Sequence, residues 1–206
     1  VFRKAKGEML NSSNEFFDTT YSGWWNTIAV ADLNTDNRPD LVIGNFGWNA
    51  QFQATEKEPL EMYYNDFDQN GSVDPLFSFY IQGKRYPYIT RDELVGQLPV
   101  KRKQFANFSS YADITLDQLF SGNELNTASH LRADHLGTAC FISNASGRFT
   151  MADLPAAVQY APIYTINVLD YNRDGKTDLL LGGNNSRTKI RLGKFDANFG
   201  VLLAGD

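Results

Sequence analysis

Residues 165–182, TINVLDYNRDGKTDLLLG, place a nine-residue acidic loop between two short apolar runs. The polar positions 1, 3, 5 and 9 of this loop are Asp170, Asn172, Asp174 and Asp178. Alternate residues of a tight loop point their oxygens inward, and Gly175 takes a backbone turn that a Cβ would hinder. Carboxylate and amide oxygens suit Ca²⁺, which takes about 6–8 oxygen ligands, and the backbone carbonyl of Lys176 at position 7 adds another. The stretch therefore predicts a calcium loop.

The same loop occurs twice more. Residues 27–44, TIAVADLNTDNRPDLVIG, align with the first stretch at an offset of 138 residues, and residues 65–75, NDFDQNGSVDP, hold a third copy. The predicted ligands, with position 7 again binding through its backbone carbonyl, are Asp32, Asn34, Asp36, Arg38 and Asp40, and Asp66, Asp68, Asn70, Ser72 and Asp74. In the copy at residues 27–44 Asn37 replaces the loop glycine. This replacement is tolerable because Asn reaches the left-handed region more easily than most residues. Three copies favour metal binding over ordinary turns and predict up to three Ca²⁺.

The loops are not EF-hands. An EF-hand needs a glutamate at position 12 and flanking helices. Position 12 is Ile43, Phe77 or Leu181 here, and the flanking runs IAV, LVIG, INV and LLLG are too short for helices and rich in β-branched residues or leucine. The sequence therefore predicts strand–calcium loop–strand hairpins.

The charge of the chain mostly follows from these loops. The net charge is −5, and nine of the 24 acidic residues are loop carboxylates. Three bound Ca²⁺ would bring the charge to about +1, which argues against a nucleic-acid partner. No apolar run approaches the roughly 20 residues of a transmembrane helix, so no membrane span is predicted. Cys140 is the only cysteine and lies in an apolar run, as a small buried hydrophobe does.

A helical insertion is predicted at about 88–136. Thr90 and Glu93 form a capping-box pattern at a helix start, and Pro99 interrupts the helical pattern. The run ITLDQLF at 114–120 has helical spacing, and we expect NELNTASHLRADHL at 123–136 to continue it. His130 and His135 would lie five apart on that helix and face different ways, so we expect no shared metal there.

The remaining sequence predicts a mainly β fold built from β-propeller blades. Short strands with a repeated turn signature are typical of propellers. The loops are 34 and 104 residues apart. Without the insertion the second spacing is about 55, near a four-stranded blade, whereas the first is too short for one. We expect about three blades in a single segment, 1–206, cut from a longer chain. Another copy or the rest of that chain would then complete the propeller.

The motifs resemble FG-GAP/VCBS-type calcium-binding propeller repeats, known from integrin α-subunit heads and exported bacterial proteins. GWWNTIAVADLNTDNRPDLVIGNFGWN is similar to one such repeat and INVLDYNRDGKTDLLLGGN to another. The order of parts, with NDFDQNGSVDP and YIQGKRYPYITRDELVGQLP between them, resembles large exported Bacteroidetes proteins related to the ASPIC/UnbV group. The resemblance covers most of residues 20–206 and implies the same loop ligands. Calcium loops of this ligand type are usually tuned to the high calcium outside the cytoplasm, so we expect an extracellular, cell-surface or periplasmic location.

Two functions remain open at the level of the sequence. The first is a non-enzymatic, calcium-stabilised segment that binds a protein or glycan partner or mediates adhesion. The second is a carbohydrate-active enzyme, most plausibly a calcium-containing polysaccharide lyase, which needs a general base such as Lys, Tyr, His or Arg. No catalytic motif is present, so no catalytic residue is predicted. The abundant aromatics, Trp24, Trp25, Trp48, Tyr63, Tyr64, Tyr86 and Tyr88, either stack on sugars or pack between blades.

Overall fold

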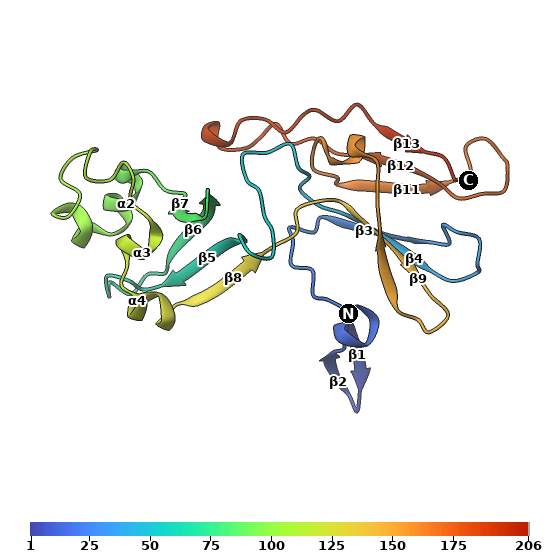
Figure 1. Cartoon of the computed structure of the whole chain (residues 1–206), viewed down its shortest axis with the longest axis horizontal. Coiled ribbons are helices and arrows are strands. Elements are labelled where there is room, and N and C mark those ends of the chain that lie inside the picture. Colours follow the sequence, from blue (N-terminus) through green and yellow to red (C-terminus); the bar gives the residue numbers. More distant parts are fainter. Residues whose placement is uncertain (206) are drawn as a thin grey trace. The chain divides into compact units, whose positions relative to one another are not determined.

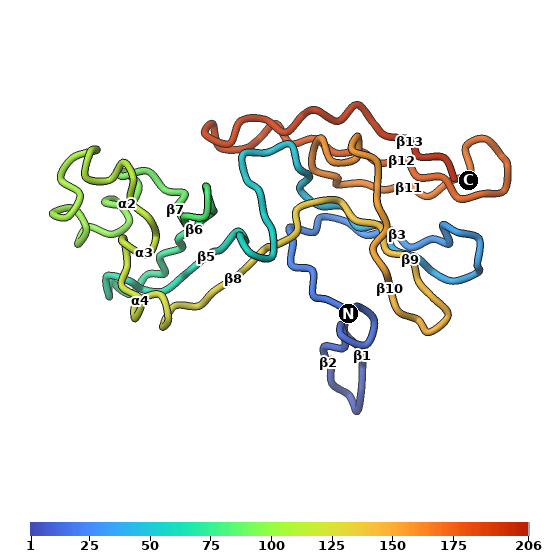
Figure 2. The backbone as a smooth tube through the Cα atoms, in the orientation of Figure 1, coloured from blue at the N-terminus to red at the C-terminus, as the bar shows by residue number. Residues whose placement is uncertain are grey.

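The computed structural model describes residues 1–205 and is mainly β, with its strands in four antiparallel sheets (Figure 1). The chain divides into two compact units. Unit 1 consists of Val1–Gln51 and the segment from Leu136 onward, and unit 2 is Phe52–His135. The chain therefore leaves unit 1, builds the whole of unit 2 and returns to unit 1, a path that can be followed from blue to red in Figure 2.

Unit 1 contains a four-stranded sheet in the order β10-β9-β4-β3. Its strands are β3 (Thr27–Ala31), β4 (Asp40–Gly44), β9 (Ala139–Ser143) and β10 (Phe149–Ala152). β3 and β4 are joined by the first predicted loop, and β9 and β10 by an Asn/Ser/Gly turn. These two hairpins meet where β4 pairs with β9 across about a hundred residues of sequence.

A three-stranded sheet in the same unit consists of β11 (Thr165–Leu169), β12 (Asp178–Gly182) and β13 (Val201–Leu203). A buried apolar cluster joins residues of this sheet to residues of β4 and β9, namely Val42, Cys140, Val158, Ile163, Leu179 and Leu181. Burying such side chains stabilises a fold by about 1.5–3 kcal/mol each. Cys140 is buried, as predicted.

Glycine ends the second strand of both loop hairpins in unit 1, and at Gly44 there is a packing reason. Gly44 pairs with Thr27, and Gly182 pairs with Thr165. A Cβ added at Gly44 would lie 2.5 Å from the backbone oxygen of Ile163, so a side chain there would push the neighbouring segment away.

Smaller elements complete unit 1. A separate hairpin of β1 (Phe2–Ala5) and β2 (Glu8–Asn11) precedes the short helix α1 (Ser13–Phe16). Two 3-10 turns, Ala156–Gln159 and Ile190–Leu192, lie in the later part of the chain.

Unit 2 is built on a four-stranded sheet in the order β7-β6-β5-β8. Its strands are β5 (Leu60–Asn65), β6 (Asp74–Ile81), β7 (Lys84–Pro87) and β8 (Ser129–Ala133). The expectation that the helix continues through 123–136 is wrong for β8, which pairs antiparallel with β5 over its whole length. His130 consequently lies on a strand and not on a helix.

The helices of unit 2 lie between β7 and β8, within the predicted insertion. They are α2 (Arg91–Gln97), the 3-10 helix Pro99–Arg102, α3 (Leu116–Leu119) and α4 (Gly122–Thr127). The capping box of α2 is present as predicted. Ten buried residues from the helices, their connections and the sheet form one core: Tyr63, Leu76, Leu94, Val95, Leu98, Phe105, Leu116, Leu119, Phe120 and Leu125.

The short spacing between the first two loops follows from this topology. The second loop belongs to unit 2, which interrupts the four-stranded sheet of unit 1 between β4 and β9. Consecutive hairpins therefore do not build consecutive blades. Within residues 1–205 the sheets close neither a barrel nor a propeller ring. No helix in this range is long and apolar enough to span a membrane.

Candidate metal centre

The three predicted loops occupy identical places in their hairpins. They connect β3 to β4, β5 to β6 and β11 to β12, and all three pairs are antiparallel. The residue before each loop pairs with the aspartate at position 9, in the pairs Ala31–Asp40, Asn65–Asp74 and Leu169–Asp178. The predicted strand–loop–strand hairpins are thus confirmed, in one common register.

The aspartate at position 1 organises the backbone of each loop. Asp170 accepts hydrogen bonds from the backbone N–H groups of Asp174 at 3.1 Å and Gly175 at 3.0 Å. The same two bonds form at Asp32 and at Asp66, with N–O distances of 2.7–3.1 Å. The position-1 carboxylates therefore hold the loops curled inward.

Two positions in every loop have left-handed backbone. Position 4, occupied by Thr35, Gln69 and Arg173, has φ of 59–63°. Position 6 has φ of 61° at Asn37, 87° at Gly71 and 83° at Gly175. Asn37 takes the place of glycine as expected, since Asn tolerates this region better than most residues.

The aspartate at position 9 is buried in all three loops. The exposed fractions of Asp40, Asp74 and Asp178 are only 0–3%. Each carboxylate accepts a hydrogen bond of 2.8–3.1 Å from the backbone N–H at position 2 of its loop. In unit 1 the other carboxylate oxygen also has a backbone donor. Ser143 N–H donates to Asp40 at 2.7 Å and Gly205 N–H donates to Asp178 at 2.9 Å. These two carboxylates tie their loops to the neighbouring segment of the unit.

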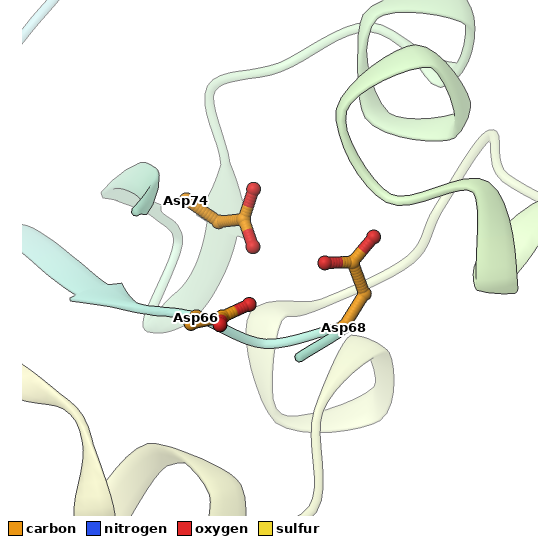
Figure 3. Close-up of side chains that lie close together, drawn as sticks. All are labelled: Asp66, Asp68 and Asp74. Atoms are coloured by element: carbon orange, nitrogen blue, oxygen red, sulfur yellow. The ribbon is translucent and has the colours of Figure 1, made fainter. Parts of the chain in front are cut away.

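The loop of unit 2 is the one in which three carboxylates converge. Asp66, Asp68 and Asp74 each place an oxygen within 4.8 Å of the others (Figure 3), and within residues 1–205 no other group of three acidic, histidine or cysteine ligands does so. Oδ1 of Asp68 is buried and has no hydrogen-bond partner. Burial raises the pKa of Asp74, the Phe67 N–H opposes this, and the charges of Asp68 and Asp66 raise it further.

The two loops of unit 1 partner their carboxylates differently. Position 3 is Asn, and its amide donates to the position-5 carboxylate, at 2.9 Å from Asn34 to Asp36 and 2.7 Å from Asn172 to Asp174. Arg38 also donates to Asp36, at 2.5 Å. The N–H of Lys176 and then the amide of Asn172 lower the pKa of Asp174.

The residues at position 7 have a common backbone bond. The N–H groups of Arg38, Ser72 and Lys176 donate to the position-5 side chains Asp36, Asn70 and Asp174, at 2.8–2.9 Å. This bond fixes the backbone at the residues whose carbonyls are the predicted ligands. The structure therefore assembles all three predicted loops, but gathers three carboxylates only in unit 2.

The residues of the unit 2 loop fit a hard divalent cation. All its candidate donors are oxygens, the ligand type of Ca²⁺ and Mg²⁺. A buried carboxylate oxygen without a partner, such as Oδ1 of Asp68, leaves a full desolvation cost that a cation would offset. The three aspartates of this loop, Asp66, Asp68 and Asp74, offer only carboxylate oxygens as ligand atoms.

A polar cluster in unit 2 was missed from the sequence. Arg85 donates to Glu61 at 3.0 Å and to the hydroxyl of Tyr63 at 2.7 Å, and it also pairs with Asp117. Nε2 of His130 lies 3.0 Å from Glu61, and its ring stacks on Tyr63 at 4.5 Å. Glu61, Tyr63, Arg85 and His130 lie on strands that pair in one sheet, and Asp117 lies on α3. Only the register of β5 with its neighbours could have revealed the four strand residues.

The chain was compared with protein-family models, with curated proteins and with solved structures, and none of these comparisons gave a match. The function is therefore inferred from the loops, the polar cluster and the surface of this chain.

Proposed function

We propose that this chain is a calcium-stabilised, non-enzymatic segment of an exported FG-GAP/VCBS-type protein, and that it binds a protein or glycan partner. The observation that carries the proposal is the loop of unit 2. Three aspartates converge there within 4.8 Å, and one buried oxygen of Asp68 has no partner. Ca²⁺ supplies the missing positive charge.

The role of the cation follows from the repulsion between the carboxylates. Two unit charges at this separation repel by about 1 kcal/mol in water and about 3–4 kcal/mol at an effective dielectric of about 20. A bound divalent cation attracts all three carboxylates, so the net electrostatic energy of the loop changes from unfavourable to favourable. The loop then becomes a rigid hairpin tip instead of a strained one.

The repeated geometry supports a propeller-repeat origin. Three loops with the same register, the same left-handed positions and the same position-1 hydrogen bonds are what one structural unit used three times would give. Two of the sheets have four strands, as propeller blades do. Calcium loops of this ligand type suit the high calcium outside the cytoplasm, which supports export.

A binding role is favoured over the alternative, a polysaccharide lyase, by the state of the polar cluster. A lyase needs a base that is free to take a proton. Burial and then the charge of Glu61 raise the pKa of Tyr63, so this phenol stays protonated at neutral pH. Arg85 is engaged by two carboxylates, which suits a structural network.

Thermal unfolding in CaCl₂ and in EDTA tests the proposal. At a calcium concentration about a hundredfold above Kd, binding contributes about 2.7 kcal/mol, which raises the Tm of a unit of this size by about 10 °C or more. Asp68→Asn removes one converging charge and should cut the calcium-induced rise by about 5 °C, as a roughly tenfold weaker affinity would.

The matched control for this variant is Asp153→Asn, an exposed aspartate outside the loops. It should leave the calcium response unchanged. A Tm that is the same in CaCl₂ and EDTA would refute the calcium role, and an equal rise with MgCl₂ would show that the site does not select Ca²⁺.

A further inference from the structure

Unit 1 has a surface hollow that the calcium loops do not use. Its volume is about 520 Å³, within the range of small-molecule sites. It is lined by Trp48, Asn49, Gln159, Tyr160 and Phe199, together with two alanines. All of these residues belong to unit 1, and they come from three separate stretches of the chain.

Trp48 is held firmly at the edge of this hollow. The backbone N–H of Trp48 donates to the backbone oxygen of Gln159 at 2.8 Å. Gly47 has a φ of 88°, and a Cβ there would lie 2.7 Å from the same oxygen. The indole packs against Gly137, where a Cβ would lie 2.7 Å from Nε1. Two glycines thus make room for one tryptophan in a fixed position.

The aromatic rings of the hollow nevertheless remain open to solvent. Trp48 is 53% exposed, Tyr160 51% and Phe199 99%. Rings in these positions contribute little to the core of the unit. Exposed aromatic side chains gathered around a hollow are typical of ligand-binding sites.

Two residues of the hollow, Gln159 and Asn49, carry side-chain amides. Gln159 is buried, and its amide exchanges two hydrogen bonds of 2.8 Å with the backbone of Thr138. Asn49 donates to the backbone oxygen of Tyr160 at 3.2 Å, which orients its amide. Among the described residues that line the hollow none is Asp, Glu, Lys, Arg or His, so this lining is complementary to an uncharged ligand.

We propose that this hollow binds an uncharged pyranose residue of a glycan. The C–H face of a sugar ring stacks on the exposed rings of Trp48 and Phe199, while its hydroxyl groups pair with the oriented amide of Asn49. A purely apolar protein side chain would use the rings but cover the Asn49 amide without using its remaining hydrogen-bonding capacity beyond the bond to Tyr160, at a cost in affinity. The inference rests on the proposed binding function, to which it adds the ligand class and the site.

Titration calorimetry with neutral hexasaccharides tests this proposal on the calcium-loaded chain. The probes are cellohexaose, xylohexaose and maltohexaose, each taken to millimolar concentration, with a galacturonic acid hexamer as the charged comparison. We expect at least one neutral probe to bind and the charged probe to bind more weakly. Phe199→Ala should weaken binding about tenfold, because a stacked ring is lost.

The matched control is Phe2→Ala, which removes a 64% exposed ring of the same unit outside the hollow. It should leave the affinity unchanged, and both variants should keep the wild-type Tm because the deleted rings are exposed. If no neutral probe binds, or if Phe199→Ala binds as wild type does, the proposal is overturned. The calcium dependence of Tm stands apart from either result, so failure of the hollow and failure of the calcium role are distinguishable.

Discussion

Aspartates of the same loop pattern have different hydrogen-bond partners in the two units. Asp40 and Asp178 are buried, and both of their carboxylate oxygens accept backbone hydrogen bonds. These bonds satisfy the charges without a cation. Asp68, in contrast, keeps a buried oxygen without a partner. The first two aspartates therefore position their loops, whereas the buried oxygen of Asp68 has no hydrogen bond to offset its charge.

Cys140 offers a prediction at this scale. Burial, and then the charge of Asp40, raises the pKa of its thiol from 9.0 to about 11. The folded state thus favours the protonated thiol, and this contribution to stability is complete below pH 9.0 and lost as the pH rises through about 11.

We expect Cys140 to resist Ellman's reagent in the folded protein at mildly alkaline pH, because the thiolate is the reactive form. The same thiol should react fully once the chain is unfolded in guanidinium chloride. Rapid stoichiometric labelling of the folded protein would contradict the buried, protonated state.

The sequence predicts the members of the site better than their contacts. Loop spacing located every candidate ligand and the left-handed Asn37, because both depend on local backbone geometry. The pairing of Arg38 with Asp36 and the convergence at Asp68 depend on side-chain placement, which spacing does not specify. Trp48 stood among seven aromatics, and only its exposure and its glycine neighbours separate it from those that pack inside.

At the scale of elements, helix α2 connects a local signal to the core of unit 2. Thr90 accepts from the N–H of Glu93, and the Glu93 carboxylate accepts from the Thr90 N–H at 2.9 Å. This capping box fixes the start of the helix. Leu94 and Val95 are then buried in the unit 2 core.

Thr90→Ala should destabilise unit 2 by about 1 kcal/mol, because one backbone N–H at the helix start loses its acceptor. Urea unfolding measures this loss as a lower midpoint at an unchanged slope. Thr127→Ala is the matched control, since its hydroxyl bonds only to carbonyls within α4. An equal loss in both variants would show that the cap has no special role.

Strand β8 shows where local pattern fails. The helical spacing at 114–120 predicts a helix that continues through 123–136, yet α4 ends at Thr127 and the backbone at Ala128 is extended. Pairing of β8 with the open edge of β5 satisfies its backbone hydrogen bonds, and this tertiary gain outweighs a weak helical preference. The local sequence of β8 does not reveal that its pairing partner is β5, a strand more than 60 residues earlier in the chain.

At the scale of the whole chain, the loops are shared between two units. The loops at Asp32 and Asp170 belong to unit 1, and the loop at Asp66 belongs to unit 2. A cation bound in one loop stabilises the unit that contains it. Mainly β architecture and the helical insertion were predictable from periodicity, but the interruption of one sheet by a complete unit was not, since strand order is not encoded in spacing.

Hydrogen exchange measured by mass spectrometry checks this division. With wild type, calcium should slow exchange most in the hairpin of β5 and β6, where three carboxylates converge, and less in that of β11 and β12, where backbone hydrogen bonds already satisfy Asp178. Asp68→Asn should raise the calcium concentration needed for protection about tenfold in unit 2 and leave unit 1 unchanged, and Asp174→Asn should alter protection only in the sheet of β11–β13. If either variant removes protection in both units, the loops do not act separately.

The pairing of β4 with β9 has a consequence for how the chain acquires its structure during synthesis. Leu41 pairs with Phe141, so the first hairpin emerges from the ribosome long before its neighbour in the sheet exists. All of Phe52–His135 is synthesised in that interval and has its own core. This unit can therefore fold before β9 is available to pair with β4. A compact intervening unit holds the ends of this long connection closer together than a flexible chain would, which lowers the entropy cost of joining β9 to β4.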